Sequence, residues 1–114
     1  MPLYAAIIYS SDLDWTAPEQ AAEMGEYAEF GQAAAEIMRG GAALFPTATA
    51  TTVRTSAKGG DVVVTDGPYA ETKEVLTGFF VLECTDLDHA IQVAATIPAA
   101  WDGAVEVRPV LPMG

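Results

Sequence analysis

Two segments of the chain, residues 3–9 and 76–84, are apolar almost throughout and lack the regular polar alternation of a strand exposed on one face. Runs of this length and composition are typical of strands buried on both faces. Any fold for this chain must therefore cover both faces of the sheet that contains them. This requirement constrains the fold more than any other feature of the sequence.

The first helix is predicted between these two strands. Thr16 can cap its start, and Glu19 stands three residues later, as in a capping box. Apolar residues at helical spacing then continue to about Arg39, where Gly40 and Gly41 form the expected stop. We therefore expect one long helix that ends at this glycine pair.

The second helix is predicted over residues 86–96, with Thr85 and Asp88 as its capping pair and Leu87, Ala90, Ile91 and Ala94 as its buried side. One strand, split at Pro46, is expected over residues 42–45 and 49–54, and further strands at 62–65 and 105–108. A hairpin turn is expected at residues 58–61. The resulting order is β-α-β-β-β-α-β. It is typical of a ferredoxin-like α+β sandwich with a mostly antiparallel sheet, formed by a single domain over residues 1–114.

Two helices can cover only one face of such a sheet. The second face would then be a large exposed apolar patch, which soluble monomers rarely tolerate. The simplest cover is the same sheet of a second copy, packed face to face. We therefore expect a homodimer.

The charge balance excludes some classes of partner. The chain has 5 Lys and Arg against 16 Asp and Glu, a formal net charge of −11. A surface this acidic repels phosphate backbones and anionic lipid, so we expect neither nucleic acid nor membrane as a partner. Cys84, the single cysteine, cannot form an internal disulfide, and the apolar run at residues 3–9 is too short for a signal peptide or a membrane span. A cytoplasmic location is expected.

The segment TDGPYAETKE, residues 65–74, joins two predicted strands with more residues and more charge than a tight turn requires. Asp66 can accept hydrogen bonds from backbone N–H groups that follow it, Gly67 permits a positive φ, and Pro68 fixes its own φ. Two interpretations stay open. Asp66 either stabilises a stiff bend, or it serves as a ligand anchor or general base at the rim of a pocket.

A pocket beneath this loop would bind an unidentified small molecule. Lys73 would neutralise an anionic group, and Thr72 and Tyr69 would supply hydroxyl groups. Each side chain also has a structural alternative, as a surface salt bridge or as core or edge packing of a strand. For Trp15 the alternative is packing at the start of the first helix. Asp66 is the catalytic candidate, and the predicted ligand-binding residues are Tyr9, Trp15, Arg54, Gly67, Pro68, Tyr69, Glu71, Thr72 and Lys73.

Motifs for metals and cofactors are missing from the sequence. The only histidine, His89, is expected on the exposed side of the second helix, so no Ser-His-Asp or Cys-His arrangement is available. The chain has no Cys-x-x-Cys, no calcium loop, no Gly-x-Gly-x-x-Gly and no P-loop. We expect no metal and no cofactor, although a carboxylate-only site around Asp66 and Glu71 stays open.

Several motifs together resemble the YCII-related superfamily, in its DGPF-domain branch. They are Asp-Gly-Pro-Tyr at residues 66–69, Ala-Glu-Thr-Lys-Glu at 70–74, Gly-Phe-Phe at 78–80, Asp-Leu-Asp at 86–88 and Val-Glu-Val-Arg-Pro at 105–109. The likeness covers nearly the whole chain. It implies a ferredoxin-like fold paired into a dimeric α+β barrel, but no defined reaction, because the family is largely uncharacterised.

The resemblance also carries two functional alternatives. Some relatives are thought to use a His–Asp pair in a dimer pocket; the aspartate maps to Asp66, but no histidine stands where its partner is expected. Residue 69 is Tyr where the motif name has Phe. Other members are fused to, or encoded near, extracytoplasmic-function sigma factors, which implies a regulatory interaction module. A purely structural dimer is the third reading, and whether any reaction is catalysed stays open.

Overall fold

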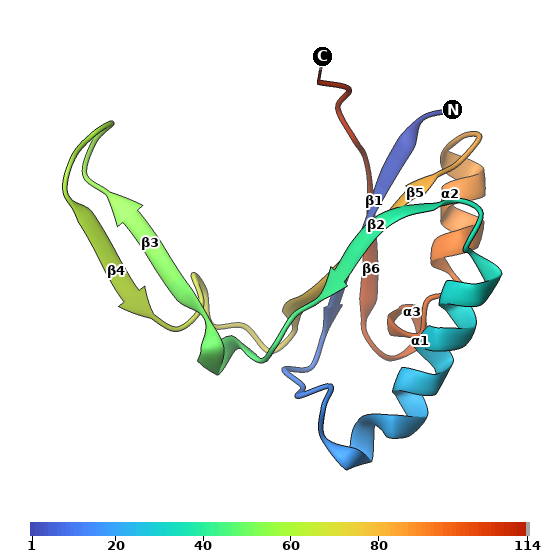
Figure 1. The fold of residues 1–114 in the computed structure, drawn as a ribbon, viewed down its shortest axis with the longest axis horizontal. Helices are drawn as coiled ribbons and strands as arrows, with labels where there is room; N and C mark the ends of the chain where they lie inside the picture. Colours follow the sequence, from blue (N-terminus) through green and yellow to red (C-terminus); the bar gives the residue numbers. More distant parts are fainter. Residues whose placement is uncertain (114) are drawn as a thin grey trace.

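Strand β1, Leu3–Ser10, is one of the two inner strands of a four-stranded sheet (Figure 1). The computed structural model describes residues 1–113. Tyr4, Ala6 and Ile8 on β1 are buried, whereas Ile7 and Tyr9, on the opposite face, are only half-buried. The prediction that this strand is buried on both faces is therefore wrong for a single chain. Both faces are apolar, but only one is covered.

The main sheet has four strands in the order β2-β5-β1-β6, and every neighbouring pair is antiparallel. In the register of the sheet, Ile7 lies opposite Phe79 on one side and Glu106 on the other. Each β-α-β unit leaves room for one strand between its own two strands, as in a ferredoxin-like fold. The mixed α+β architecture is compatible with the predicted fold. The strands other than β1 are β2 Met38–Ala43, β5 Val75–Glu83 and β6 Ala104–Pro109.

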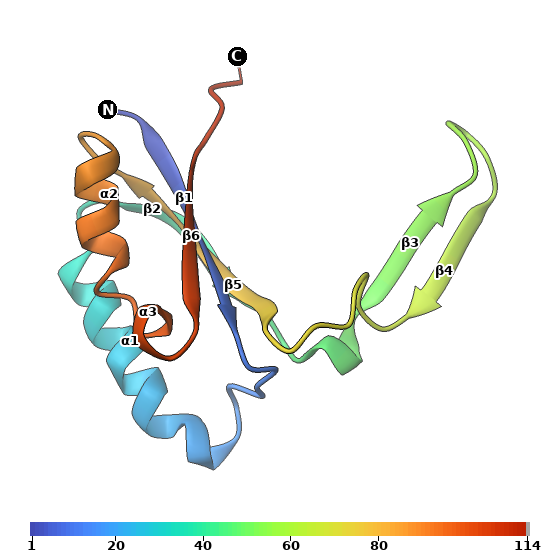
Figure 2. The same ribbon diagram turned by 180° about the vertical axis from the view of Figure 1, so that it is seen from behind.

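The helices pack against one face of this sheet (Figure 2). They are α1 Ala21–Ala33, α2 Leu87–Ala94 and the short α3 Ala99–Asp102, which the sequence did not predict. Phe30 of α1 and Ala90 and Ala94 of α2 are buried as expected, but Leu87 and Ile91 are 48% and 51% exposed. The buried cluster comprises Tyr4, Ala6, Ile8, Phe30, Ala34, Leu82, Cys84, Ala90, Ala94, Ile97 and Ala99.

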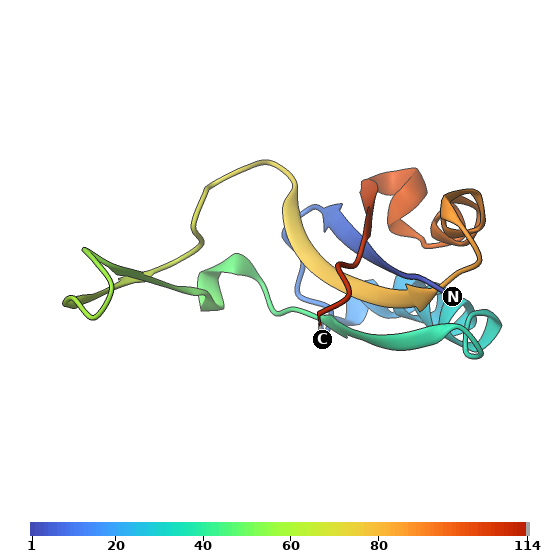
Figure 3. The same cartoon turned by 90° about the horizontal axis from the view of Figure 1, so that it is seen from above.

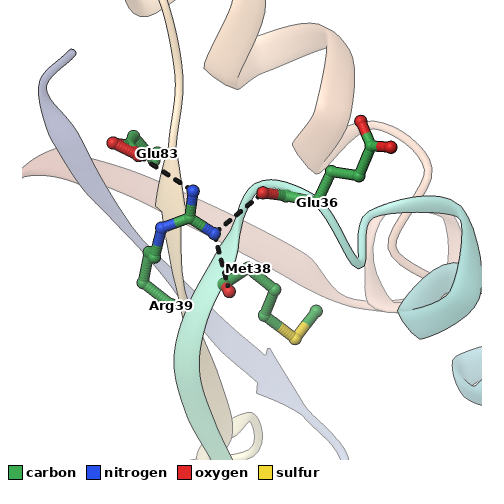
Figure 4. A network of polar contacts seen from close by, with 4 residues as sticks. All are labelled: Glu36, Met38, Arg39 and Glu83. Atoms are coloured by element: carbon green, nitrogen blue, oxygen red, sulfur yellow. Dashed lines mark hydrogen bonds and ion pairs between the residues drawn. The ribbon is translucent and has the colours of Figure 1, made fainter.

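The end of α1 differs from the prediction. The helix stops at Ala33, and Gly41 pairs with Phe80 in the sheet instead of ending a helix. Arg39 secures this change of direction (Figure 4): its Nη1 donates to the carbonyl oxygen of Glu36 at 2.8 Å, and its Nη2 forms an ion pair with Glu83 at 3.0 Å. Pairing with β5 therefore outweighs the low strand propensity of the Met-Arg-Gly-Gly-Ala-Ala segment.

Both predicted helix caps are wrong. The hydroxyl and the backbone N–H of Thr16 donate to the Asp14 carboxylate at 2.6 and 2.9 Å, and a 3-10 turn, Pro18–Gln20, precedes α1. The cap of α2 is Asp86, whose carboxylate accepts the N–H of His89 at 2.9 Å, rather than Thr85. In each case an aspartate in the preceding loop accepts the backbone hydrogen bond.

Strands β3, Thr51–Thr55, and β4, Val62–Asp66, form a hairpin with a sheet of its own. Its turn contains Gly59 at φ 75°, which confirms the predicted hairpin. We call residues 51–66 the arm. Figure 1 shows it projecting away from the main sheet on the side opposite the helices. The radius of gyration is accordingly 16.0 Å, compared with about 13 Å for a compact domain of this length.

The face of the main sheet that the helices leave uncovered is defined here as the open face. Phe79 and Leu76 on this face are 37% and 42% exposed. The view from above shows the helices on one side of the sheet and the arm extending well beyond it (Figure 3). The register also places Glu83, Glu106 and Arg108 on this face. The apolar side chains of the open face include Leu3, Ala5, Ile7, Tyr9, Ala42, Leu76, Phe79, Val81 and Ala104.

The helices are short. Within residues 1–113, none combines the length and the apolar composition that crossing a bilayer would require.

Candidate functional site

The motif segment lies between the arm and the main sheet. Residues 67–74 lead from the end of β4 to the start of β5, and residues 44–50 lead from β2 to β3. The two connections therefore run between two separate sheets, which explains why a two-residue turn would not be long enough. Phe45, 69% exposed, and the 3-10 turn Thr47–Thr49 belong to the first connection.

Gly67 fixes the direction of the chain as it leaves the arm. Its φ of 102° lies in the region that glycine adopts at little cost, as the sequence predicted. Its N–H donates to the carbonyl oxygen of Ala50 at 2.8 Å, and its own carbonyl oxygen accepts the hydroxyl of Thr52 at 2.8 Å. These hydrogen bonds join the two connections at the root of the arm.

A polar cavity of about 390 Å³ opens beside this root. We call it the polar cavity. The carboxylates of Asp12 and Glu71 and the hydroxyls of Thr47 and Thr72 give it its chemical character. It is lined by Asp12, Thr47, Ala48, Gly67, Pro68, Ala70, Glu71, Thr72 and Val75.

Asp12 and Thr47 were not among the predicted site residues. The Asp12 carboxylate accepts the backbone N–H of Thr47 at 2.9 Å and also its hydroxyl. Both hydrogen bonds lower the pKa of Asp12 below its usual range, and the one from the hydroxyl has the larger effect. Asp12 therefore stays ionised. They link the loop after β1 to the connection that leads into the arm. A contact between residues 35 positions apart gives no signal in sequence periodicity.

Four of the predicted site residues line the polar cavity: Gly67, Pro68, Glu71 and Thr72. The side chain of Tyr69 itself is 77% exposed. The Arg54 guanidinium of β3 lies 5.0 Å from its ring centre, in a cation–π contact. These two predicted ligand residues therefore contact each other. Neither Arg54 nor Tyr69 contributes to the wall of the cavity.

Asp66 and Lys73 are exposed and lie outside the lining. Asp66 is the last residue of β4 and pairs with Thr51 through the backbone. Within the part of the chain that the structure describes, its carboxylate makes no hydrogen bond to a backbone N–H. Its catalytic role and the anion-neutralising role of Lys73 stay predictions.

Tyr9 and Trp15 lie elsewhere. Tyr9 is on the open face, opposite Leu76 and Ala104 in the register of the sheet. Trp15 packs edge-on against Tyr27 of α1, with ring centres 5.4 Å apart, in the wall of a different cavity. The structure therefore does not bring these two aromatic residues to the motif loop.

The histidine is also remote from the polar cavity. His89 is half-buried at the start of α2, where its Nδ1 accepts the backbone N–H of Thr85 at 3.0 Å. Among residues 1–113, no three His, Cys, Asp or Glu side chains lie close enough together to hold a metal ion. The chemistry available at the polar cavity is that of carboxylates and hydroxyls. Such a set accepts hydrogen bonds from amines and hydroxyl groups.

The sequence matches the YCII-related domain over residues 3–114, which is nearly the whole chain. It is also 37% identical, over 114 aligned residues, to the uncharacterized protein R00369 of Rhizobium meliloti (strain 1021), with 94% of this chain and 90% of that protein covered. A mixed α+β domain with an antiparallel sheet and this match define the class. The chain belongs to the YCII-related domain family, and its place in the DGPF branch stays a prediction.

Proposed function

We propose that the protein is a homodimer, joined through the open face and the arm as a dimeric α+β barrel, and that the polar cavity beside loop 66–74 binds a small polar molecule. The proposal has two parts, the assembly and the ligand. Each rests on its own observations and has its own experiment.

The observation that carries the assembly is the surface area of the single chain. The accessible surface is 7620 Å², whereas a monomer of this mass exposes about 5,900 Å². Two chains that each bury the difference would share an interface of about 3,400 Å², within the roughly 2,000–5,000 Å² of permanent homodimers. In a monomer, this additional accessible surface would stay exposed to water.

The chemistry of the excess surface supports the same conclusion. On the arm, Val53, Val62, Val63 and Val64 are all more than half exposed. These valines point to both faces of a two-stranded hairpin, which is at best marginally stable by itself in water. Exposed apolar surface of this kind, on the arm and on the open face, is typical of protein interfaces. An identical chain offers a second arm and a second open face of matching character.

The ligand part rests on the polar cavity. Its volume of about 390 Å³ is within the usual range for small-molecule sites. Asp12 and Glu71 make it acidic, so an amine or a polyhydroxyl compound fits better than an anion. If an acid–base step takes place beside this cavity, a carboxylate performs it. Asp66, which adjoins the lining residue Gly67 but is itself outside the lining, remains the proposed catalytic residue.

Sedimentation equilibrium tests the assembly. We expect the native chain to be a dimer at micromolar concentration, and Phe79→Asp, which buries a charge at the centre of the open face, to weaken the dimer by at least about 30-fold, or 2 kcal/mol. Leu87→Asp is the matched control, because Leu87 is comparably exposed but lies on the helical side. A native chain that sediments as a monomer contradicts the assembly.

A thermal-shift screen with small amines and polyols tests the ligand part. A compound that stabilises the native dimer should lose its effect in Glu71→Gln and keep it in Glu74→Gln, because Glu74 is outside the lining. Equal responses of both variants contradict the site. A sigma factor that co-purifies with the native chain from its own cells would favour the regulatory alternative instead.

A further inference from the structure

A second cavity lies between α1 and the β2 side of the main sheet, about 350 Å³ in volume. We propose that it binds a neutral, flat, mostly apolar molecule that carries a hydrogen-bond acceptor such as a carbonyl oxygen. We call it the apolar cavity. It shares no lining residue with the polar cavity and lies on the helical side of the sheet, so the proposal does not depend on the dimer.

The cavity exists because the sheet carries small residues where it faces α1. Gly41 pairs with Phe80, and Ala43 pairs with Gly78, in the register that places Ile8 and Phe80 on the helical face. Side chains no longer than a methyl group leave space between the sheet and the helix. Well-packed interiors contain few voids larger than a water molecule. This space is instead partly open to solvent, so a small molecule can enter it.

The walls suit a flat apolar molecule. Trp15 meets Tyr27 nearly at a right angle, at 80°, and Tyr27 lies 6.4 Å from Phe80 between ring centres. Met24 and Met38 supply adaptable side chains around these rings. Ligand sites of this size are usually apolar and aromatic with a small number of polar groups, and this cavity has that composition.

The polar groups in the wall define the rest of the ligand. Trp15 Nε1 is buried and has no hydrogen-bond partner among the described residues. The Tyr27 hydroxyl lies near the backbone N–H of Ala99, which is outside the lining. An indole N–H only donates, so its missing partner must be an acceptor. Thr77, the other polar side chain of the lining, is already engaged with Ser10 at 3.0 Å. The acceptor is therefore predicted to meet Trp15, after a small adjustment of the ring.

The charge of the protein selects a neutral ligand. The chain carries a net charge of −11. Burial and then the negative charges of Glu23 and Glu26, on the same helix, raise the pKa of the Tyr27 hydroxyl. An anion would be repelled there, and a cation would lose its hydration in an apolar space without gaining a charged partner in the lining. A ketone, quinone or similar neutral compound meets both conditions.

Two naphthalenes of similar shape test the proposal on the full-length protein: 2-acetylnaphthalene, which carries an acceptor, and 2-ethylnaphthalene, which does not. Binding is measured by titration calorimetry. Ala28→Phe should fill the cavity and weaken both by more than about tenfold, because Ala28 lines it from an exposed helix position. Ala22→Phe is the matched control, exposed on the same helix and outside the lining.

Trp15→Phe tests the acceptor. It should weaken 2-acetylnaphthalene about tenfold more than 2-ethylnaphthalene, as expected for one lost hydrogen bond. The proposal is overturned if the native protein binds neither compound, or if Ala22→Phe weakens binding as much as Ala28→Phe does. Equal losses for both compounds in Trp15→Phe would overturn the role of the acceptor.

Discussion

The main sheet and the arm are built from similar apolar residues, yet their environments differ. On β1, every second side chain is buried beneath α1 and α2, and those between are half-buried. On β4, five consecutive residues that include three valines are all exposed. The comparison teaches that an apolar strand forms part of a core only where another element of the same chain lies over it. The arm has no such element in its own chain.

The two regions also differ in what holds them in place. The main sheet is held by side-chain packing against helices, whereas the arm is held by its own ladder of backbone hydrogen bonds and by the contacts at its root. We therefore expect substitutions at buried positions of the main sheet to affect folding, and substitutions in the arm to act mainly through assembly. Three measurements examine this difference, from the largest expected effect to the smallest.

The largest effect is expected from Leu82→Ala compared with Val64→Ala, both in a monomeric Phe79→Asp background. Leu82 is 1% exposed in the buried cluster, and its truncation should reduce the free energy of unfolding by about 2–5 kcal/mol. Val64 is 60% exposed, and its truncation should change the same quantity by less than about 0.5 kcal/mol. Urea unfolding measures both. A comparable loss at Val64 would mean that the arm packs against its own chain.

An intermediate effect is expected from Gly67→Ala compared with Gly25→Ala. A Cβ atom at either position would meet nothing within 4 Å, so only the backbone differs. Gly67 has φ 102°, and alanine there should destabilise by about 1–2 kcal/mol. Gly25 is inside α1, where alanine should stabilise by about 1 kcal/mol. The midpoint of thermal unfolding should fall in Gly67→Ala and rise in Gly25→Ala. A shift of the same sign in both variants would refute the backbone explanation.

The smallest effect concerns Glu23. Burial and the nearby Asp102 carboxyl raise the pKa of Glu23 from 4.5 to about 7. Between pH 4.5 and 7, Glu23 is therefore protonated in the folded state and ionised in the unfolded state. The contribution of Glu23 to stability is therefore present below pH 4.5 and is lost as the pH rises towards 7. Glu23→Gln should flatten this fall in a pH series of urea unfolding curves. Asp61→Asn, at the tip of the arm, should leave the fall unchanged.

The sequence predicted much of the fold because its strongest signals are local. The order of the elements, the hairpin with Gly59 and the strand that became β5 follow from apolar runs and turn residues. The end of α1 was mispredicted because Met38–Ala43 has little strand propensity and becomes a strand only by pairing with β5. Local signals also do not show which strands pair, so the separate sheet of the arm was not foreseen.

The candidate site was predicted in part for a similar reason. The motif loop supplies Gly67, Pro68, Glu71 and Thr72 to the polar cavity, and these were recognised from the loop itself. Asp12 and Thr47 reach the cavity from other segments and were missed. Trp15 was assigned to this loop, but its neighbour is Tyr27 on α1, a proximity that only the path of the chain after β1 determines.

The hydrogen bonds between Asp12 and Thr47 lie where the loop after β1, both connections of the arm and the polar cavity meet. The arm and the walls of that cavity therefore share the same few joints. A rotation of the arm about its root would therefore change the shape of the cavity. A rigid ligand bound between Asp12 and Glu71 would in turn restrict that rotation, because the same residues form the root and the cavity wall.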